Sequence, residues 1–466
     1  MRSTLYSITA SIVLLLLAVP AFASDLTLFG HTGVVNMAEF SPDGQTIATV
    51  SGDNTARIWN AKTGELIHLL RSSETTNAHN AAITGLAFTP SGSRLVTWAF
   101  DSTARVWNTA TGQLAFTLSG HGGRVRWGEI NGSKIVTAGA DMTARIWDIE
   151  TGTAGPVLRG HTDWVFRASF NKAGTRVATA AQDSTARIWD AATGALLHTL
   201  RLADTLGTHT NMRVQGAIFS PDGASVLTYS FDSSIHVWNA ETGAHIRTLQ
   251  GHSDRIAWAE YSSDGSRILT AGFDKKTLLF DAATGSIVRE ITGHTSSVFV
   301  ARFSPDNKRI VTAGFDGVSL VVDIASGDLL RRVTPGGRVQ WAQFSPDGNF
   351  TVTSSDTTAR VWDLMNPTGV DREVVLRHAS VVGRVDVIPN PTSGADISVD
   401  IELLRSAMVR LDIVDASGAL RATTSVHRGE GQQRVSIDGR ALPSAQYFVR
   451  VSSGSESVTV PITIVK

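Results

Sequence analysis

One short sequence recurs along this chain of 466 residues, and its period limits what the chain can fold into. It reads TARIWN, TARVWN, TARIWD, TARIWD, SIHVWN and TARVWD, beginning at Thr55, Thr103, Thr143, Thr185, Ser234 and Thr358. Each copy follows an Asp, and a Gly-His pair or a variant of it stands upstream of most copies. A fixed period of about forty residues indicates one supersecondary unit that is repeated.

A single copy shows how the unit is built. The copy from Gly160 to Leu200 contains four short runs with β propensity, separated by turn residues, and other copies place Pro-Asp-Gly in the first of these turns. We label the four expected strands a to d. A sheet of four short strands cannot bury both of its faces alone, whereas copies stacked around a ring bury both faces and leave only short edges. The sequence therefore predicts an all-β fold with an eight-bladed ring.

These residues resemble the WD-repeat β-propeller family over about residues 26–378. The resemblance implies a hydrogen-bonded network in each blade, made by the Gly-His histidine, a Ser or Thr of strand b, the Asp of the b–c turn and the Trp of strand c. A buried Asp and His need polar partners, and a shared network supplies them. The expected members are His31, Asp53 and Trp59, His79, Asp101 and Trp107, His121, Asp141 and Trp147, His161, Asp183 and Trp189, His209, Asp232 and Trp238, His252 and Asp274, and His294 and Asp316.

The last three blades depart from this pattern. Phe280 and Val322 replace the strand-c Trp of blades six and seven, and Gly336-Gly337 replaces Gly-His in blade eight. Regularly spaced His and Asp could also suggest a metal or catalytic site. One pair per blade would place these groups too far apart to share an ion, so we expect a structural network, with neither a bound metal nor a cofactor.

The number of d strands exceeds the number of blades by one. Leu26–Phe29 precedes the first His as a d strand should, and Glu373–Leu376 could also supply the d strand of blade eight. We predict that the N-terminal segment closes the ring beside strand c of blade eight, because closure removes an exposed edge.

The chain begins with features of a secretory signal peptide at residues 1–23. Arg2 is followed by the apolar stretch Ile12–Val19 and by Ala21-Phe22-Ala23, a small-x-small cleavage site. The apolar run is too short for a membrane anchor of about twenty residues, and no later segment is suited to span a membrane. The chain has no cysteine and a formal net charge of −1, so neither a thiolate site nor an affinity for nucleic acid is expected.

A different pattern occupies the C-terminal residues. A linker is expected over 379–388, although Val381–Ile388 could also be a first strand, and alternating runs over 389–466 predict a small antiparallel β-sandwich. Pro389–Gly394, the turn at Val414–Gly418, the strand at Tyr447–Val451 and the terminal Lys466 resemble the C-terminal sorting domain of the type IX (Por) secretion system. This resemblance implies export to the surface of a Bacteroidota-like bacterium. The alternative is an accessory sandwich that binds a ligand itself.

The d–a and b–c turns should lie on one face of the ring, which a-strand residues also reach. The expected residues are Arg124, Arg126, Trp164, Phe166, Arg213, Gln215, Arg255, Phe299, Arg338 and Gln340, and the residue before the turn Asp adds Phe100, Gln182, Phe231, Phe273 and Phe315. Arginine and aromatic residues are typical of binding hot spots. We call this set the Arg/aromatic face and expect it to bind a protein, a peptide or an acidic glycan. The alternative is that the Phe residues only cap blade edges and the Arg residues are solvated.

Two further sequence features bear on this face. Trp127, Trp258 and Trp341 are expected to point between blades and to pack in the core. The loops Arg71–Asn77 and Arg201–Gly207 are longer than the other d–a loops and could form the walls of a groove.

The sequence thus favours a secreted or cell-surface binding or scaffold module that is not an enzyme. A hydrolase or lyase acting at the channel mouth is one rival, and a structural spacer in a surface layer is another. No local enzyme motif occurs, and no carboxylate stands among the a-strand positions expected on the face.

Overall fold

The computed structural model describes residues 25–71, 78–201 and 213–365, and the strands of the C-terminal part between 382 and 464. These residues form an all-β protein, as the sequence predicted. In this part of the chain we find no helix with the length and apolar character needed to cross a membrane.

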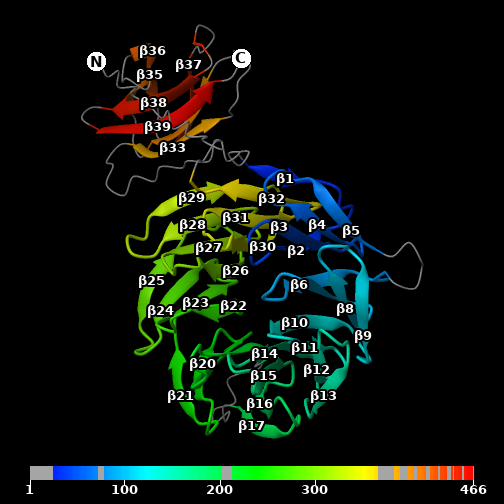
Figure 1. Cartoon of the computed structure of the whole chain (residues 1–466). Helices are drawn as coiled ribbons and strands as arrows, with labels where there is room; N and C mark the ends of the chain where they lie inside the picture. The colour runs from blue at the N-terminus through cyan, green and yellow to red at the C-terminus, as the bar shows by residue number, and fades with distance from the viewer. Residues whose placement is uncertain are drawn as a thin grey trace, which may run out of the picture.

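Eight four-stranded antiparallel sheets are arranged in a ring, with strand a of each blade innermost and strand d outermost (Figure 1). Blades one to four comprise β2 (Val35–Phe40), β3 (Thr46–Ser51), β4 (Ala56–Asn60) and β5 (Leu66–Leu70); β6 (Ile83–Phe88), β7 (Arg94–Ala99), β8 (Thr103–Asn108) and β9 (Leu114–Ser119); β10 (Val125–Asn131), β11 (Lys134–Gly139), β12 (Thr143–Asp148) and β13 (Ala154–Arg159); and β14 (Val165–Phe170), β15 (Arg176–Ala181), β16 (Ala186–Asp190) and β17 (Leu196–Leu200).

The second half of the ring repeats the same order. Blades five to seven comprise β18 (Val214–Phe219), β19 (Ser225–Ser230), β20 (Ile235–Asn239) and β21 (His245–Leu249); β22 (Ile256–Tyr261), β23 (Arg267–Gly272), β24 (Thr277–Asp281) and β25 (Ile287–Ile291); and β26 (Val298–Phe303), β27 (Arg309–Gly314), β28 (Ser319–Asp323) and β29 (Leu329–Val333). Blade eight comprises β30 (Val339–Phe344), β31 (Phe350–Ser355), β32 (Thr358–Asp363) and β1 (Leu26–Leu28).

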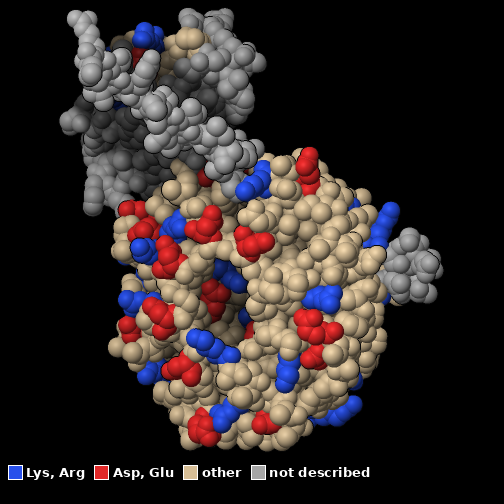
Figure 2. All heavy atoms as spheres, viewed as in Figure 1, with Lys and Arg blue, Asp and Glu red and all other residues tan. Residues whose placement is uncertain are grey.

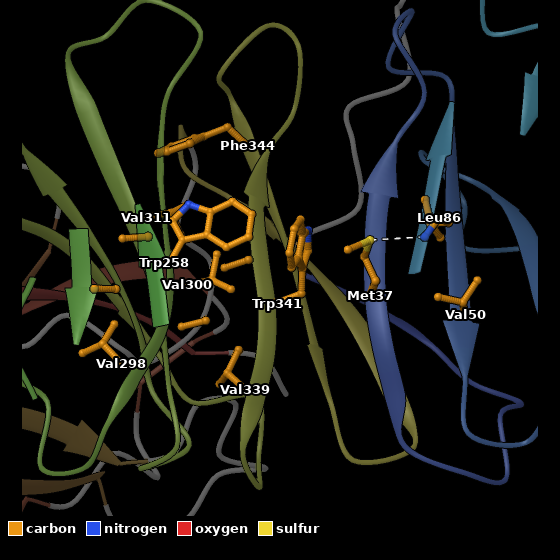
Figure 3. Packing of buried hydrophobic residues seen from close by; sticks show 14 of the residues in the cluster. Met37, Val50, Leu86, Trp258, Val298, Val300, Val311, Val339, Trp341 and Phe344 are labelled. Carbon is orange, nitrogen blue, oxygen red and sulfur yellow. Dashed lines mark hydrogen bonds between the residues drawn. The ribbon is translucent and has the colours of Figure 1, made fainter. Parts of the chain in front are cut away.

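The hydrophobic core lies between the blades. Strands b are buried along almost their whole length, because each of their two faces meets a neighbouring blade. One cluster joins blade eight to blade one through Val352, Ala359, Val35 and Trp59. Figure 3 shows another part of the core, in which Met37 of β2 lies between Trp341 of β30 and Leu86 of β6. The blades therefore depend on one another for burial of their apolar surface.

Every strand a contains a β-bulge near its start. In blade three Val125 pairs with Gly139 and Trp127 pairs with Ala138, so Arg126 has no partner in strand b. The same shift occurs in the other seven a strands. A bulge interrupts the alternation of side chains and twists the strand locally. Residues on either side of it therefore point in directions that simple alternation does not predict.

The N-terminal segment closes the ring, which confirms the prediction. Strand β1 pairs antiparallel with β32, with Leu26 opposite Val361 and Leu28 opposite Ala359. The rival segment Glu373–Leu376 lies outside the described residues.

An ion pair fixes this closure. The guanidinium of Arg331, in strand d of blade seven, donates to both carboxylate oxygens of Asp25, with Nη2–Oδ2 at 2.8 Å, and also donates to the carbonyl of Asp363. Asp25 in turn accepts the backbone N–H of Asp363 at 3.2 Å. Burial raises the pKa of Asp25, and the charge of Arg331 opposes that rise. One arginine therefore ties together both ends of the propeller.

The C-terminal strands form two antiparallel sheets, which agrees with the predicted sandwich. One sheet has the order β33 (Val382–Ile388), β34 (Ile397–Leu403) and β37 (Gly431–Ile437). The other has the order β36 (Leu420–Arg428), β35 (Ala407–Asp415), β38 (Ala445–Ser453) and β39 (Glu456–Ile464). The linker expected over 379–388 is thus a strand over 382–388, because its alternating residues pair with β34.

The clasp at Arg331 can be tested by substitution. Arg331→Met keeps the packing against Trp362 but leaves the Asp25 carboxyl half-buried without its cation, so we expect a loss of about 1–3 kcal/mol in unfolding free energy. Urea denaturation followed by tryptophan fluorescence measures the loss. Asp25→Asn should add little to Arg331→Met, because both changes remove the same pair. Additive losses would show that the pair does not hold the ring closed.

Candidate ligand-binding face

A hydrogen-bonded network is present at the start of most blades. In blade four His161 Nδ1 lies 2.8 Å from Asp183 Oδ2, and His161 Nε2 lies 2.7 Å from Thr179 Oγ1. The indole N–H of Trp189 donates to the same Thr179 oxygen at 2.8 Å. The Asp also accepts the backbone N–H of Thr162, so it ties the d–a loop to the b–c turn.

The same geometry recurs around the ring, with departures where the sequence departs. The His–Asp and His–Thr contacts also join His31, Asp53 and Thr49, His79, Asp101 and Thr97, His121, Asp141 and Thr137, His252, Asp274 and Thr270, and His294, Asp316 and Thr312. Trp59, Trp107 and Trp147 donate to the Thr of their blades as Trp189 does. In blade five Trp238 donates to Thr228, while His209 lies outside the described residues. In blade eight Trp362 donates to Thr353 where no His is present.

The network controls the ionisation of its members. Burial lowers the pKa of His79, more than the neighbouring Asp101 raises it, so the imidazole is neutral at neutral pH. Burial alone would raise the pKa of Asp101, but the hydrogen bond and charge of His79 and the hydrogen bonds of Thr103 bring it down to about 2. The carboxylate thus stays ionised and holds the turn.

The turn aspartates fix the position of the residues beside them. The residue before the turn Asp donates its backbone N–H to the carbonyl of the residue before strand a, as in Phe273 to Arg255 at 2.9 Å and Phe231 to Arg213 at 3.0 Å. In blades one to seven this hydrogen bond links the start of strand a to the b–c turn, and the side chains of the Arg/aromatic face leave the backbone near these two points.

The arginines of this face stack on aromatic rings of the preceding blade. The guanidinium carbon of Arg124 lies 4.8 Å from the ring centre of Phe100 in blade two. Arg338 of blade eight lies 5.3 Å from Phe315 in blade seven. Arg255 of blade six lies 5.7 Å from Phe231 in blade five and 3.8 Å from Phe273 in its own blade. Stacking of this kind holds a flat guanidinium in place while its N–H edges face outward.

Further aromatic contacts connect these pairs into an arc. Arg126 lies 5.6 Å from Trp164 and 5.0 Å from Phe166, and Phe166 contacts Phe231 at 6.2 Å. Phe315 contacts Phe273 at 6.3 Å and stacks on Phe299 at 5.2 Å. The predicted residues from blade two to blade eight are therefore neighbours in space, with Trp164 being 41% exposed.

The arc carries an excess of positive charge. Burial lowers the pKa of Arg126, and the nearby charge of Arg124 lowers it further. The acidic residues Asp163 and Asp254 stand beside the arc, and each accepts the N–H of the residue that follows it. An anion placed between Arg124 and Arg126 would relieve their mutual repulsion.

Some predicted residues take no visible part in this arc. Four of them make no aromatic or ionic side-chain contact in the described part of the chain: Gln182, Gln215, Gln340 and Arg213. The backbone of Gln182 is still bonded to that of Trp164, and the backbone of Arg213 to that of Phe231. Most of the two long d–a loops, residues 72–77 and 202–212, lies outside the described residues.

The tryptophans of strand a pack in the core, as expected, but they also contact one another across the ring, which was not expected. Trp127 of blade three contacts Trp258 of blade six at 5.8 Å, and Trp258 contacts Trp341 of blade eight at 5.4 Å. Blades three and six are not neighbours, so these rings meet across the centre of the ring. The bulge accounts for the difference, because it redirects the residue that follows it.

An arginine completes this central packing. The guanidinium carbon of Arg167, from blade four, lies 4.4 Å from the ring centres of both Trp127 and Trp258, and Arg167 donates to the hydroxyl of Tyr229 at 2.7 Å. Sequence reasoning missed this residue because Arg in strand a was assigned only to the exposed face.

Three carboxyl groups also line the centre, on strands a. Glu39, Glu129 and Glu260 occupy equivalent positions of β2, β10 and β22, nearer the a–b turns than the tryptophans. Figure 2 shows a hollow at the centre of the ring with acidic and basic side chains inside it. The sequence-based prediction covered only the positions at the start of strand a, near the Arg/aromatic face. These glutamates lie near the other end of the strand. No group of three or more potential ligands in the described residues is arranged to hold a metal ion.

Comparison with known proteins places the chain in a family. The model of the WD domain, G-beta repeat, matches eight segments, at residues 24–60, 70–108, 112–148, 152–190, 200–239, 243–281, 285–321 and 330–363. The chain therefore belongs to the WD-repeat family. Residues 386–466 match the secretion system C-terminal sorting domain. The protein is thus a WD-repeat propeller that carries a type IX sorting domain, and this confirms both resemblances.

Individual relatives share only about one repeat with the chain. An uncharacterised WD repeat-containing protein of Synechocystis is 56% identical over 45 residues, which are 9% of this chain and 13% of that protein. Eukaryotic translation initiation factor 3 subunit I of Aspergillus niger is 51% identical over 41 residues, 9% of this chain and 12% of that protein. The chain thus spans about an eighth of the length of these relatives.

A solved structure matches over a larger part. The crystal structure of the computationally designed Ika8 protein superposes with a TM-score of 0.64 and 26% identity, covering 73% of this chain and 100% of the other. The likeness agrees with a propeller built from repeats.

The histidine–aspartate network predicts how stability depends on pH. The folded pKa of His79 is lowered, so its contribution is present above about pH 6.5 and declines as the pH falls below that value. The folded pKa of Asp101 is about 2, so its contribution declines between about pH 4 and pH 2. The urea concentration at the midpoint of unfolding, measured from pH 8 to pH 2.5, should therefore decrease in two steps. One step lies below about pH 6.5 and the other between about pH 4 and pH 2.5.

Substitution of Asp101 measures how much this carboxylate contributes to the pH dependence of stability. Asp101→Asn should cost about 1–2 kcal/mol at pH 7 and flatten the decline below pH 4, because the amide does not titrate. Asp328→Asn, at an exposed carboxylate, is the matched control and should leave the profile unchanged. Equal slopes below pH 4 in Asp101→Asn and the unsubstituted protein would contradict the assignment.

Proposed function

We propose that this protein is a secreted or cell-surface module whose Arg/aromatic face binds an acidic segment of another protein. The family and the sorting domain support an extracellular protein-binding or scaffold role. The identity of the ligand and the residues that bind it are the proposal. The signal peptide at residues 1–23 is proposed to begin the export that the sorting domain indicates.

The stacked arginines support this proposal most directly. Arg124, Arg255 and Arg338 are exposed, yet each is held against an aromatic ring of the preceding blade. A guanidinium that is already ordered loses less conformational entropy when it pairs with a carboxylate. Its free edge can donate two parallel hydrogen bonds to one carboxylate. A row of such groups along the arc suits a ligand with several carboxylates.

The aromatic rings give the same face an apolar component. Trp164 and Phe166 flank Arg126, and Phe299 stacks on Phe315 beside Arg338. A mixture of arginine and large aromatic residues is typical of the parts of an interface that contribute most to affinity. We therefore expect an acidic peptide with apolar residues to bind more tightly than a uniformly charged polymer.

Charge reversal tests the assignment of the face. Arg124→Glu, Arg126→Glu and Arg338→Glu together should weaken binding of a labelled acidic peptide containing Phe and Glu by at least about tenfold, because three attractive charges become repulsive. Fluorescence anisotropy at 50 mM salt measures the affinity, and the melting temperature checks the fold. Polygalacturonate, tested alongside, distinguishes an acidic glycan from a protein ligand.

The control variant has the same total change of charge, placed outside the Arg/aromatic face. Lys134→Glu, Lys172→Glu and Lys308→Glu alter three exposed lysines outside the face and should leave peptide binding within about twofold. Unchanged binding in the arginine variant, or an equal loss in both variants, would show that the face is not the site.

Export is tested by the mass of the native protein in each cell fraction. We expect a species outside the cell that begins near Ser24 and lacks about eighty C-terminal residues, because sorting domains of this kind are removed during surface delivery in the family that the tail resembles. Intact mass spectrometry of medium, cell surface and periplasm makes the comparison. A chain ending at Lys466 and confined to the periplasm would contradict the proposal.

A further inference from the structure

A second polar pocket lies at the opposite ends of the a strands. Strand a begins at the Arg/aromatic face, and the pocket is formed where the a strands of blades one, seven and eight end. It has a volume of about 320 Å³, and its polar side chains are Glu39, Arg302, Gln343 and Ser345. Its apolar lining comes from Phe40, Phe88, Phe303 and Phe344, and from prolines of three a–b turns. Figure 3 shows Phe344 near the end of β30, away from Trp341.

The positive charge of the pocket is already compensated. Arg302 Nε lies 3.2 Å from Glu260 Oε2, and its guanidinium carbon lies 5.3 Å from the ring of Trp258 and 5.1 Å from that of Trp341. Glu260 also accepts the backbone N–H of Phe303 at 2.7 Å. Arg302 is therefore held by a carboxylate and two rings, which leaves it poorly placed to recognise an anion.

Two acceptors of the pocket lack donors. The side-chain carboxylate of Glu39 accepts no hydrogen bond from the described residues, whereas the carboxylates of Glu129 and Glu260 accept the backbone N–H groups of Phe170 and Phe303. The Oε1 atom of Gln343 is buried and receives no hydrogen bond from the described residues. A buried acceptor without a donor is costly, so the Gln343 oxygen would gain from a ligand that donates hydrogen bonds, and the half-buried Glu39 carboxylate offers a second acceptor beside it.

The surroundings of the pocket favour a cation. Each of the three turns contains Ser-Pro-Asp, and the serine hydroxyls of Ser41 and Ser304 donate to Asp43 and Asp306 at 2.6 and 2.5 Å. These hydrogen bonds are the main reason that the pKa of both carboxyls is lowered, so both are ionised. The faces of phenylalanine rings can also attract a cation. Arg309, whose guanidinium carbon lies 5.4 Å from the ring centre of Phe344, adds a positive charge beside the lining.

From these observations we infer that the pocket binds an organic ammonium group, with the Glu39 carboxylate and the Gln343 carbonyl oxygen as its hydrogen-bond acceptors. An ammonium has three N–H donors and no acceptor, which matches two free oxygens in a ring of aromatic side chains. The group could belong to a lysine side chain of a peptide or to a small alkylamine. This site is independent of the Arg/aromatic face and has the opposite charge preference.

The ionisation of Glu39 makes binding depend on pH. Burial raises the pKa of Glu39 to about 7, and the charge of Arg302 opposes the shift. The other charged groups at the channel side are Glu260, Glu129 and Arg167, of which Glu129 also has its pKa raised by burial to about 7. An ammonium favours the charged form of Glu39. Its affinity should thus rise about tenfold between pH 6 and pH 8, as the ionised fraction of a group with a pKa of about 7 rises.

The test uses the chain from Ser24 to Lys466 and n-butylammonium as the first probe, followed by isothermal calorimetry and ligand-observed NMR. An acetylated Gly-Lys-Gly amide distinguishes a peptide side chain from a small amine. We expect saturable binding of at least one ammonium probe, no binding of n-butanol, and the rise in affinity with pH. Glu39→Gln should weaken binding at least tenfold and abolish its pH dependence.

Matched variants separate the site from its surroundings. Glu129→Gln removes an equivalent carboxyl outside the pocket lining and should leave the affinity within about twofold at pH 8. Gln343→Met keeps Glu39 and should weaken binding without removing the pH dependence, and melting temperatures show whether each variant folds. The triple arginine variant of the other face should bind ammonium normally. Preferential binding of propionate, unchanged affinity in Glu39→Gln, or no saturable ammonium binding would overturn the inference.

Discussion

Burial of both faces of each blade against its two neighbours is the constraint on which the rest of the structure depends. A four-stranded sheet of this size leaves apolar side chains such as Val177 and Ile188 exposed when it stands alone, and it covers them only between two others. The ring must therefore close, and β1 and the Arg331–Asp25 pair provide the closure. The networks of His, Asp, Thr and Trp then fix each turn, so that side chains beside the turn aspartates take defined positions.

Most of the fold could be predicted because its information is local and repeated. The Gly-His, turn Asp and strand-c Trp recur at fixed spacings, and one network accounts for all of them. The arc of arginines and aromatic residues could be predicted in part, because the repeat pattern identifies the positions beside the turn aspartates. The pairing of Arg124 with Phe100 of the preceding blade requires the angle between blades, which no spacing encodes.

The centre of the ring could not be predicted for a different reason. A bulge in every a strand changes which residues face the axis, and alternation of side chains no longer applies. Trp127 and Trp258 therefore meet across the ring, with Arg167 against both rings, in addition to packing in the core. The glutamates of the a strands come to line the same space. The chain consequently presents arginines at one end of the a strands and unpaired acceptors at the other.

The closing strand has a consequence for the order in which the protein folds. Leu28 pairs with Ala359, about 330 residues further along the chain, so the first strand of the propeller to be synthesised cannot pair until nearly the last strand is available. Until β32 is available, the first and last blades each keep one uncovered face. A chain crossing a membrane from its N-terminus would remain an open series of blades during most of its passage. The finished ring, and with it both proposed ligand sites, would then form only on the far side.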